Sequence, residues 1–155
     1  MGVLQGAPFT GIVAGSLDRK GRICIPASFR HILASQSPGT VYVRKALLTS
    51  SLEAFGASVM QRFHEAQSES DPFFQGSHDS AAFALLALSQ ELAIDDTGRV
   101  RIPDDFIAHA GLTETVTFIG IGRRFEIWDS ARFEPVLRER TAAAVEQQRR
   151  QGERP

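Results

Sequence analysis

The sequence predicts an α+β fold made of two tandem copies of one unit, each a β-hairpin followed by a short helix. The main observation is an internal repeat: the stretch LDRKGRICIPASF from Leu17 returns as IDDTGRVRIPDDF from Ile94, at a constant offset of 77 residues in a chain of 155. Both copies show strand-like alternation and then a proline that can open a helix. A unit of this length buries too little surface to fold alone, so we expect the two copies to complete one core. The positions that the copies share are Asp18 and Asp95, Gly21 and Gly98, Arg22 and Arg99, Ile25 and Ile102, Pro26 and Pro103, and Phe29 and Phe106.

The first unit opens with a predicted β-hairpin. Residues 11–17 (GIVAGSL) and 22–25 (RICI) have the composition of strands, and the turn between them begins at Asp18. An Asp at a turn entry can accept hydrogen bonds from the backbone two residues on, and Gly21 can adopt a positive φ at no steric cost. Alternation along the second strand directs its isoleucines inward and Arg22 outward.

The second unit has the same pattern over residues 90–94 (QELAI) and 99–102 (RVRI). Asp95 and Gly98 occupy the corresponding turn positions, and Arg99 is the outward residue. Both predicted hairpins therefore present an arginine on the exposed face directly after the turn.

Proline ends each hairpin and opens a short helix. Pro26 and Pro103 fit the first helical turn, where a missing N–H costs little. In the second copy, Asp104 and Asp105 favour the positive end of the helix, and Gly111 suits its C-terminal end.

A further strand is predicted after each short helix, over residues 40–43 (TVYV) and 115–121 (TVTFIGI). After the first of these strands, Ser50 and Glu53 have the spacing of a capping box, which predicts an amphipathic helix. The apolar positions of that helix are Leu52, Phe55, Val59 and Phe63.

A last helix is predicted at the C-terminal end of the chain, where Asp129 or Ser130 can cap it. Pro135 is expected to kink or restart this helix, because a proline inside a helix removes a hydrogen bond. The tail, residues 146–155, is expected to fray.

The joint between the copies is expected in residues 67–80 (QSESDPFFQGSHDS), where Pro72 interrupts the preceding helix. We assign residues 1–77 to the first half-repeat with its connecting helix, and residues 78–155 to the second half-repeat with the C-terminal helix. The two halves are expected to form one pseudo-dimeric domain.

Composition excludes several classes of protein. The chain is 43% hydrophobic and 23% charged, as is usual for a soluble globular protein. Cys24 is its single cysteine, which excludes an intrachain disulfide framework, and the histidines lack the spacing of a zinc site. The apolar run 81–88 is too short to cross a bilayer, and the N-terminus has no leader pattern. We expect a cytoplasmic protein with no metal, no cofactor and no membrane partner.

The charges are unevenly placed along the chain. The net charge is −1, but residues 1–77 carry seven Lys and Arg against five Asp and Glu, whereas residues 78–155 carry ten against thirteen. A protein of this kind can still bind a polyanion if its basic residues gather on one face. It would then depend on several copies acting together rather than on a strong global field.

The doubled Asp-x-x-Gly-Arg turn, followed each time by Ile-Pro and Phe, resembles the MraZ family of bacterial transcription regulators. The segment 124–129 (RFEIWD) is similar to the second-half signature of that family, and the resemblance covers nearly the whole chain. In the related AbrB family, two chains swap hairpins into a single barrel, and MraZ-like proteins look like that dimer fused into one chain. The resemblance thus implies a swapped-hairpin, AbrB-like β-barrel with additional helices.

The same resemblance implies a function. Similar proteins bind direct repeats in the promoter of the division and cell-wall gene cluster, usually repress it, and assemble as rings. The implied function is that of a sequence-specific DNA-binding regulator, nucleoid-associated and homo-oligomeric, with double-stranded DNA as its partner and no enzymatic activity.

The candidate DNA-binding residues lie in and beside the two turns. Arg22 and Arg99 can make bidentate bonds to guanine or phosphate, and the turn carboxylate can orient the guanidinium. The second turn is less cationic than the first, because Asp96 and Thr97 occupy two of its positions. Alternatively, each Asp–Arg pair is structural and merely closes its turn. The candidates are Asp18, Arg19, Lys20, Arg22, Asp95, Arg99 and Arg101.

Two other readings of the sequence remain open. A group of double-barrel decarboxylases cuts its own chain at Gly-Ser, and the dipeptides Gly15–Ser16 and Gly76–Ser77 occur here, although no activating acid, base or nucleophile stands beside them. A ring-forming scaffold without specific DNA contact is the other alternative. Arg123 and Arg124 fit either a solvated strand edge or a secondary phosphate contact.

Overall fold

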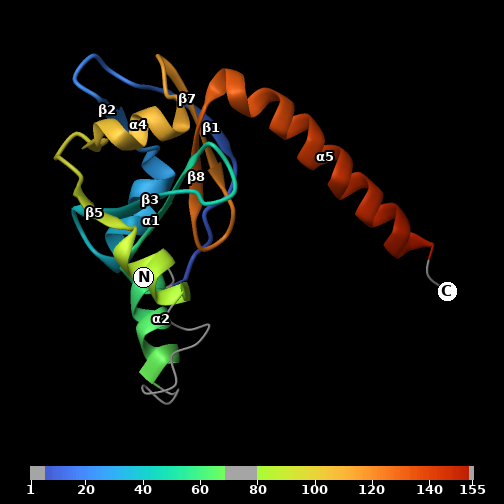
Figure 1. Cartoon of the computed structure of the whole chain (residues 1–155), viewed down its shortest axis with the longest axis horizontal. Helices are drawn as coiled ribbons and strands as arrows, with labels where there is room; N and C mark the ends of the chain where they lie inside the picture. Colours follow the sequence, from blue (N-terminus) through green and yellow to red (C-terminus); the bar gives the residue numbers. More distant parts are fainter. Residues whose placement is uncertain (1–5, 69–79, 154–155) are drawn as a thin grey trace.

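The computed structural model describes residues 6–68 and 80–153 and has an α+β architecture (Figure 1). The strands are β1 (Ile12–Ser16), β2 (Arg22–Cys24), β3 (Thr40–Lys45), β4 (Leu52–Phe55), β5 (Gln90–Ala93), β6 (Arg99–Arg101), β7 (Thr115–Gly120) and β8 (Phe125–Asp129). The helices are α1 (Ala27–Gln36), α2 (Ala57–Ser68), the short π-helix η1 (Phe83–Ala87), α4 (Asp104–Ala110) and α5 (Ser130–Gly152). The predicted joint and the boundary between residues 77 and 78 fall largely or wholly outside the described residues.

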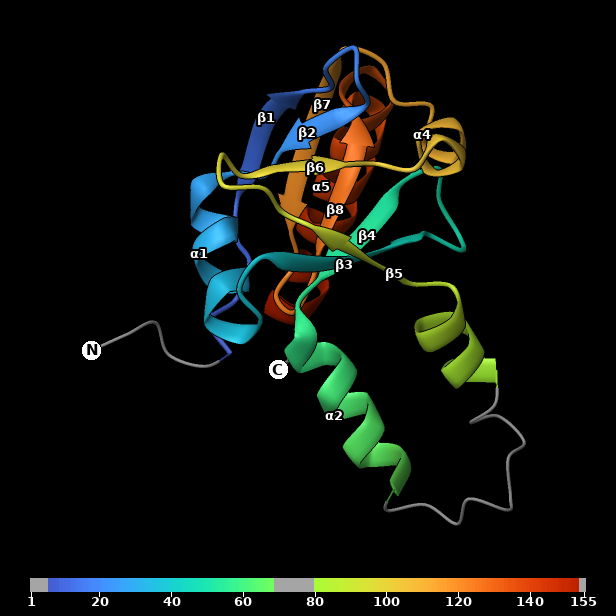
Figure 2. The ribbon, with the colours of Figure 1, turned by 90° about the vertical axis from the view of Figure 1, so that its left-hand side faces the viewer.

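The described strands form two antiparallel sheets. Six of them have the order β1-β7-β8-β4-β3-β5, and this sheet is open, with β1 and β5 at its edges. β2 and β6 form a separate two-stranded ribbon. In Figure 2, β6 crosses in front of β7 and β8, so the ribbon covers one face of the larger sheet.

Most strand pairs join an element before residue 69 to one after residue 79. β1 pairs with β7, β2 with β6, β3 with β5 and β4 with β8. The repeat-equivalent residues Ile23 and Val100 lie directly opposite each other in the ribbon. Pairing of equivalent positions is the pattern of a two-fold relation between the copies.

The predicted hairpins exist only at their tips. A single bridge, Leu17 to Ile23, links β1 and β2, and Ile94 to Val100 links β5 and β6 in the same way. Beyond each bridge the two strands separate, because β1 joins β7 in the larger sheet while β2 joins β6 in the ribbon. The two strands of each predicted hairpin therefore pair with each other only beside the turn, and partners distant in sequence complete them.

The core lies between the ribbon, α1 and the larger sheet. Ile23 and Val100 are each 1% exposed, as the alternation predicted for the inward face of the ribbon. Phe125 is fully buried, and its ring centroid is 5.0 Å from that of Phe9 and 4.9 Å from that of Phe29. Burial of one such ring stabilises the fold by about 1.5–3 kcal/mol.

Both short helices begin where proline predicted them. Pro26 precedes α1 and its carbonyl accepts the backbone N–H of Arg30 at 2.9 Å, and Pro103 stands in the same relation to α4. Gly111 ends α4 with φ +58°, in the left-handed region that favours glycine.

The helix predicted from the capping box is wrong in its first part. Leu52–Phe55 form strand β4, and α2 begins only at Ala57. Glu53 does not cap a helix but pairs across the sheet with Arg44 of β3, with 2.8 Å between Nη2 and Oε2. Leu52 is completely buried. Sheet neighbours on both sides therefore override the local helix signal.

The C-terminal helix α5 is longer than predicted and is not interrupted. It runs without a break through Pro135, and residues 146–152, expected to fray, are helical. Its base is anchored because Arg140 donates to the buried carboxylate of Glu126 at 2.8 Å, while Phe133 packs on Trp128. The distal part projects away from the rest of the described fold (Figure 1).

Candidate nucleic-acid interface

The first turn is organised around the carboxylate of Asp18. Its Oδ1 accepts the backbone N–H groups of Lys20 and Arg22, each at 2.9 Å. Its Oδ2 accepts Nε of the Arg22 side chain at 2.9 Å. Gly21 closes the turn with φ +76°. Because Arg22 uses Nε for this bond, the edge formed by its two terminal nitrogens stays available for a ligand.

The second turn has the same backbone but a different side-chain pairing. Oδ1 of Asp95 accepts the backbone N–H of Arg99 at 2.8 Å and both the N–H and the hydroxyl of Thr97. Gly98 has φ +83°. Among the described residues, the guanidinium of Arg99 has no hydrogen bond or ion pair. The predicted carboxylate–guanidinium contact therefore forms in the first turn and not in the second.

Both turn carboxylates have a lowered pKa. The backbone N–H of Arg22 is the main cause of the lower pKa of Asp18, and the backbone N–H of Arg99 is the main cause for Asp95, relative to the ordinary value of 3.8. A carboxylate that accepts several N–H bonds is stabilised in its charged form. Both turns are therefore held by ionised aspartates at neutral pH.

This arrangement predicts acid sensitivity. The pKa of Asp18 and of Asp95 is lower in the folded chain than in the unfolded chain, so their contribution to stability is complete above the ordinary pKa and is lost as the pH falls through the folded-state pKa. We expect the melting temperature to fall between about pH 5 and about pH 2, and to fall less in the double variant Asp18→Asn, Asp95→Asn. Asparagine still accepts the backbone bonds through its side-chain oxygen, so the turns should persist.

Thermal melts across that pH range test this prediction, with Asp96→Asn as the matched control. Asp96 lies in the second turn and makes no hydrogen bond within the described residues. Asp105, whose pKa is lowered by its hydrogen bond to Lys45, accounts for part of the remaining acid response. An identical acid response in the wild type and the double variant would contradict the role of the turn carboxylates.

The outward face of the ribbon gathers arginines from both copies. β2 and β6 run antiparallel, with Arg22 opposite Arg101 and Cys24 opposite Arg99. These four side chains lie on the face opposite to the buried pair Ile23 and Val100, which stands between them. The two turns lie at opposite ends of the ribbon. The face thus carries three arginines over a short antiparallel pair of strands.

The third of these arginines is partly engaged within the fold. Arg101 forms an ion pair with Asp104 at 2.9 Å and donates to the carbonyl of Ile102. Its guanidinium lies against Gly21, so a side chain at that glycine would collide with it. Arg101 is therefore tied to the base of the first turn, whereas the side chains of Arg19 and Lys20 are exposed and make no hydrogen bond or ion pair within residues 6–68 and 80–153.

Sequence reasoning missed Arg30, which α1 places over the second turn. A Cβ atom on Gly98 would lie 2.5 Å from Nη1 of Arg30, and Nε of Arg30 is buried without a hydrogen-bond partner in the described structure. The repeat gives no hint of this residue, because Ile107 occupies the equivalent place in α4. Arg30 supplies positive charge to the turn that the sequence marks as less cationic.

The geometry also bears on the alternatives. Gly15 and Ser16 lie within β1, in register with Val116 and Thr115 of β7, so this Gly-Ser is an ordinary strand dipeptide. Gly76 and Ser77 lie outside the described residues. Among the described residues, no helix combines the length and the apolar character needed to cross a membrane.

Comparison with known proteins places the chain in a family. Residues 85–154 match the family model described as "MraZ protein, putative antitoxin-like". A Transcriptional regulator MraZ of Rhodospirillum rubrum is 37% identical over 128 residues, which cover 82% of this chain and 83% of the relative. The chain belongs to the MraZ family.

Other MraZ relatives match over similar or longer spans. The Transcriptional regulator MraZ of Gluconacetobacter diazotrophicus is 36% identical over 152 residues, or 93% of this chain and 96% of the relative. The Transcriptional regulator MraZ of Xanthobacter autotrophicus is 38% identical over 125 residues, which cover 81% of this chain and 79% of the relative. These matches cover most of the chain. They confirm the family resemblance that was inferred from the two Asp-x-x-Gly-Arg turns.

Proposed function

We propose that this MraZ-family protein is a sequence-specific DNA-binding transcriptional regulator whose β2–β6 ribbon enters the major groove. The observation that carries the proposal is Arg99, which is exposed on the outward face of the ribbon and has no ion pair within the described residues. A purely structural Asp–Arg pair accounts for Arg22 but leaves Arg99 without a role.

The dimensions and the chemistry of the ribbon support this mode of binding. The major groove of B-DNA is about 12 Å wide and admits a two-stranded β-ribbon. In our proposal, Arg22 and Arg99 form bidentate bonds to guanine, while Arg19 and Lys20 contact phosphates beside the first turn. Asp18 and Asp95 hold the turns rigid, which lowers the entropic cost of ordering the arginines on DNA.

We further infer that the fold is a swapped-hairpin, AbrB-like barrel, with residues 1–77 and 78–155 as two halves of one pseudo-dimeric domain. The pairing of β1 with β7, β2 with β6 and β3 with β5 supports this inference. Reciprocal bonds do so as well: the N–H of Ile25 donates to the carbonyl of Gly98 at 3.0 Å, and the N–H of Ile102 to that of Gly21 at 2.9 Å.

We also propose that the protein acts as a homo-oligomer, in the form of a ring, on the promoter repeats of the division and cell-wall gene cluster, as a nucleoid-associated repressor in the cytoplasm. A net charge of −1 gives one copy little attraction for DNA, so linked copies are needed for useful affinity. Helix α5 exposes Leu137 and, on its projecting part, Val145, and apolar side chains on an unpartnered helix face suit contact with a second copy.

Genomic mapping of DNA bound by the protein tests the proposed function. We expect a peak upstream of the gene cluster, over short repeats, and a purified protein that binds those repeats more tightly than a scrambled duplex of equal length. Equal affinity for the two duplexes, or absence of a peak, would favour the ring-forming scaffold.

The intact mass of the purified protein tests the self-processing enzyme. We expect one full-length chain, and fragments cut at Ser16 or Ser77 would favour the enzyme instead.

A further inference from the structure

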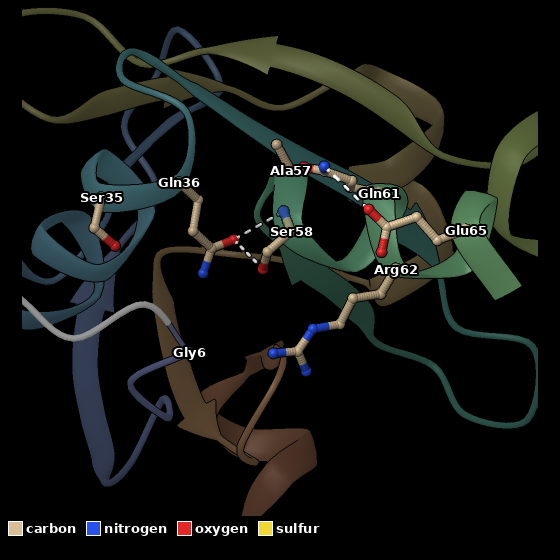
Figure 3. Close-up of a pocket in the computed structure, with 8 residues that line it drawn as sticks. All are labelled: Gly6, Ser35, Gln36, Ala57, Ser58, Gln61, Arg62 and Glu65. Atoms are coloured by element: carbon tan, nitrogen blue, oxygen red, sulfur yellow. Dashed lines mark hydrogen bonds between the residues drawn. The ribbon is translucent and has the colours of Figure 1, made fainter.

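A polar pocket lies away from the ribbon, between the C-terminal end of α1 and the N-terminal part of α2 (Figure 3). Its volume is about 240 Å³. A second hollow adjoins it, because Gly6, Gln36, Ser58 and Arg62 line both, and Arg123 from the β7–β8 connection lines the second. Together they form one cleft, which we name the α1–α2 pocket.

The amide of Gln36 is fixed so that it presents a donor to this pocket. Its Oε1 accepts the backbone N–H of Ser58 at 3.2 Å and the Ser58 hydroxyl at 2.7 Å. A backbone N–H can only donate, so the atom facing it must be the amide oxygen. The NH₂ group of Gln36 therefore points away from Ser58 into the space that the Arg62 side chain also enters (Figure 3).

The close approach of Gln36 depends on a glycine at the start of α2. A Cβ atom on Gly56 would collide with Oε1 of Gln36. Gly56 is itself buried, at the junction of β4 and α2. The backbone thus leaves room for the amide to be held in this one orientation.

Two arginines complete the donor set. The guanidinium groups of Arg62 and Arg123 make no hydrogen bond or ion pair with the described residues, and Nη2 of Arg62 would lie 3.6 Å from a Cβ atom on Gly6. Glu65 lines the outer part of the pocket and accepts a bond from Gln61 at 3.3 Å. Among the described residues, no carboxylate lines the part of the pocket that both arginines line.

We propose that the α1–α2 pocket binds a small molecule that carries a phosphate group. Its donors come from three directions, namely the Gln36 amide and the Arg62 and Arg123 guanidinium groups, and a tetrahedral oxyanion offers acceptors to all three. The start of α2 lies beside them, and a helix N-terminus favours an anion. The volume suits a compact metabolite rather than a nucleotide.

Titration calorimetry on the DNA-free, full-length protein tests the proposal, with glycerol 3-phosphate as the probe and glycerol as the uncharged control. We expect saturable binding of glycerol 3-phosphate and none of glycerol. Gln36→Ala, Arg62→Ala and Arg123→Ala should each weaken binding by about tenfold or more, because each removes a donor to a charged group. Arg124→Ala is the matched control, since Arg124 neighbours Arg123 but does not line the pocket.

Melting curves show that each variant is folded before its titration is interpreted. No saturable binding of either glycerol 3-phosphate or inorganic phosphate would overturn the proposal. So would binding that persists unchanged in the double variant Arg62→Ala, Arg123→Ala. If that double variant instead loses affinity for DNA while the wild type ignores both probes, the arginines serve the DNA backbone and the pocket is not a small-molecule site. None of these outcomes depends on the ribbon as the DNA interface.

Discussion

The double variant Arg22→Ala, Arg99→Ala is expected to lose specific binding to the promoter repeats. Each lost bidentate base contact costs about 1–3 kcal/mol, so two such losses weaken binding by roughly two to four orders of magnitude, and linked copies multiply the effect. Stability should change little. The guanidinium of Arg99 has no hydrogen bond or ion pair to lose within the described residues, and Asp18 keeps its two backbone bonds when Arg22 is removed.

Titration of repeat-containing and scrambled duplexes at two salt concentrations, together with a melting curve for each variant, measures this prediction. Lys20→Ala serves as a contrast: a phosphate contact supports all sequences alike, so this variant should weaken both duplexes and reduce the salt slope by about 0.9. Arg150 is paired with Glu146 on the distal part of α5, and this part of the helix lies away from the ribbon. The variant Arg150→Ala should therefore change neither the affinity for the two duplexes nor the salt slope. If the double variant unfolds while its folded fraction binds the repeats normally, the two arginines are structural.

The second large effect is expected on cutting the chain in two. Residues 1–77 alone should not fold as a monomer, because β1 and β2 each lose their partner strand, and β3 and β4 each lose one of two. The fragment also loses Phe125, which contacts both Phe9 and Phe29 in the core. So short a chain buries too little surface to offset the entropy of ordering it.

Circular dichroism melts and light scattering of the fragment test this prediction. We expect either no cooperative transition or a self-associated species in which a second fragment replaces the missing half. Mixing residues 1–77 with residues 78–155 should restore a cooperative melt, and the intact chain is the reference. A monomeric fragment with a cooperative melt would show that the first half has a core of its own.

Local chemistry was enough to predict the turns and the short helices. Asp18 and Asp95 accept backbone bonds within their own turns, and Gly21 and Gly98 adopt the positive φ that those turns require. These contacts span only a few residues, so the sequence determines them directly. The inward isoleucines and outward arginines follow from alternation in the same way.

Elements whose partners lie far away in sequence could not be predicted in this way. Glu53 has the spacing of a capping residue, but Arg44 on the neighbouring strand binds it and Leu52 is buried between β3 and β8. Residues 125–129 form β8, and every one of its side chains is buried. Its sequence therefore lacks the alternation of apolar and polar residues that would indicate a half-exposed strand. Tertiary neighbours decide both segments.

The candidate site shows the same division. The turn residues were identified because the repeat doubles them, whereas Arg30 was missed because only one copy has it. Asp95 was expected to orient Arg99, but within the described residues it accepts only the backbone N–H of Arg99 and bonds from Thr97, and the Arg99 guanidinium makes no hydrogen bond to it. The role of the arginines on DNA stays a prediction.

The near-symmetry of the ribbon has a consequence for the DNA it would read. A homodimer with a true two-fold axis presents identical side chains at both ends and therefore favours palindromes. Here the strands pair around Ile23 and Val100, yet Arg19 and Lys20 flank one end while Asp96 and Thr97 flank the other. Fusion of the halves lets each end diverge, so the proposed interface has a polarity. Copies bound to successive sites on one strand then face the same way, and inverting a single site turns the more cationic end around.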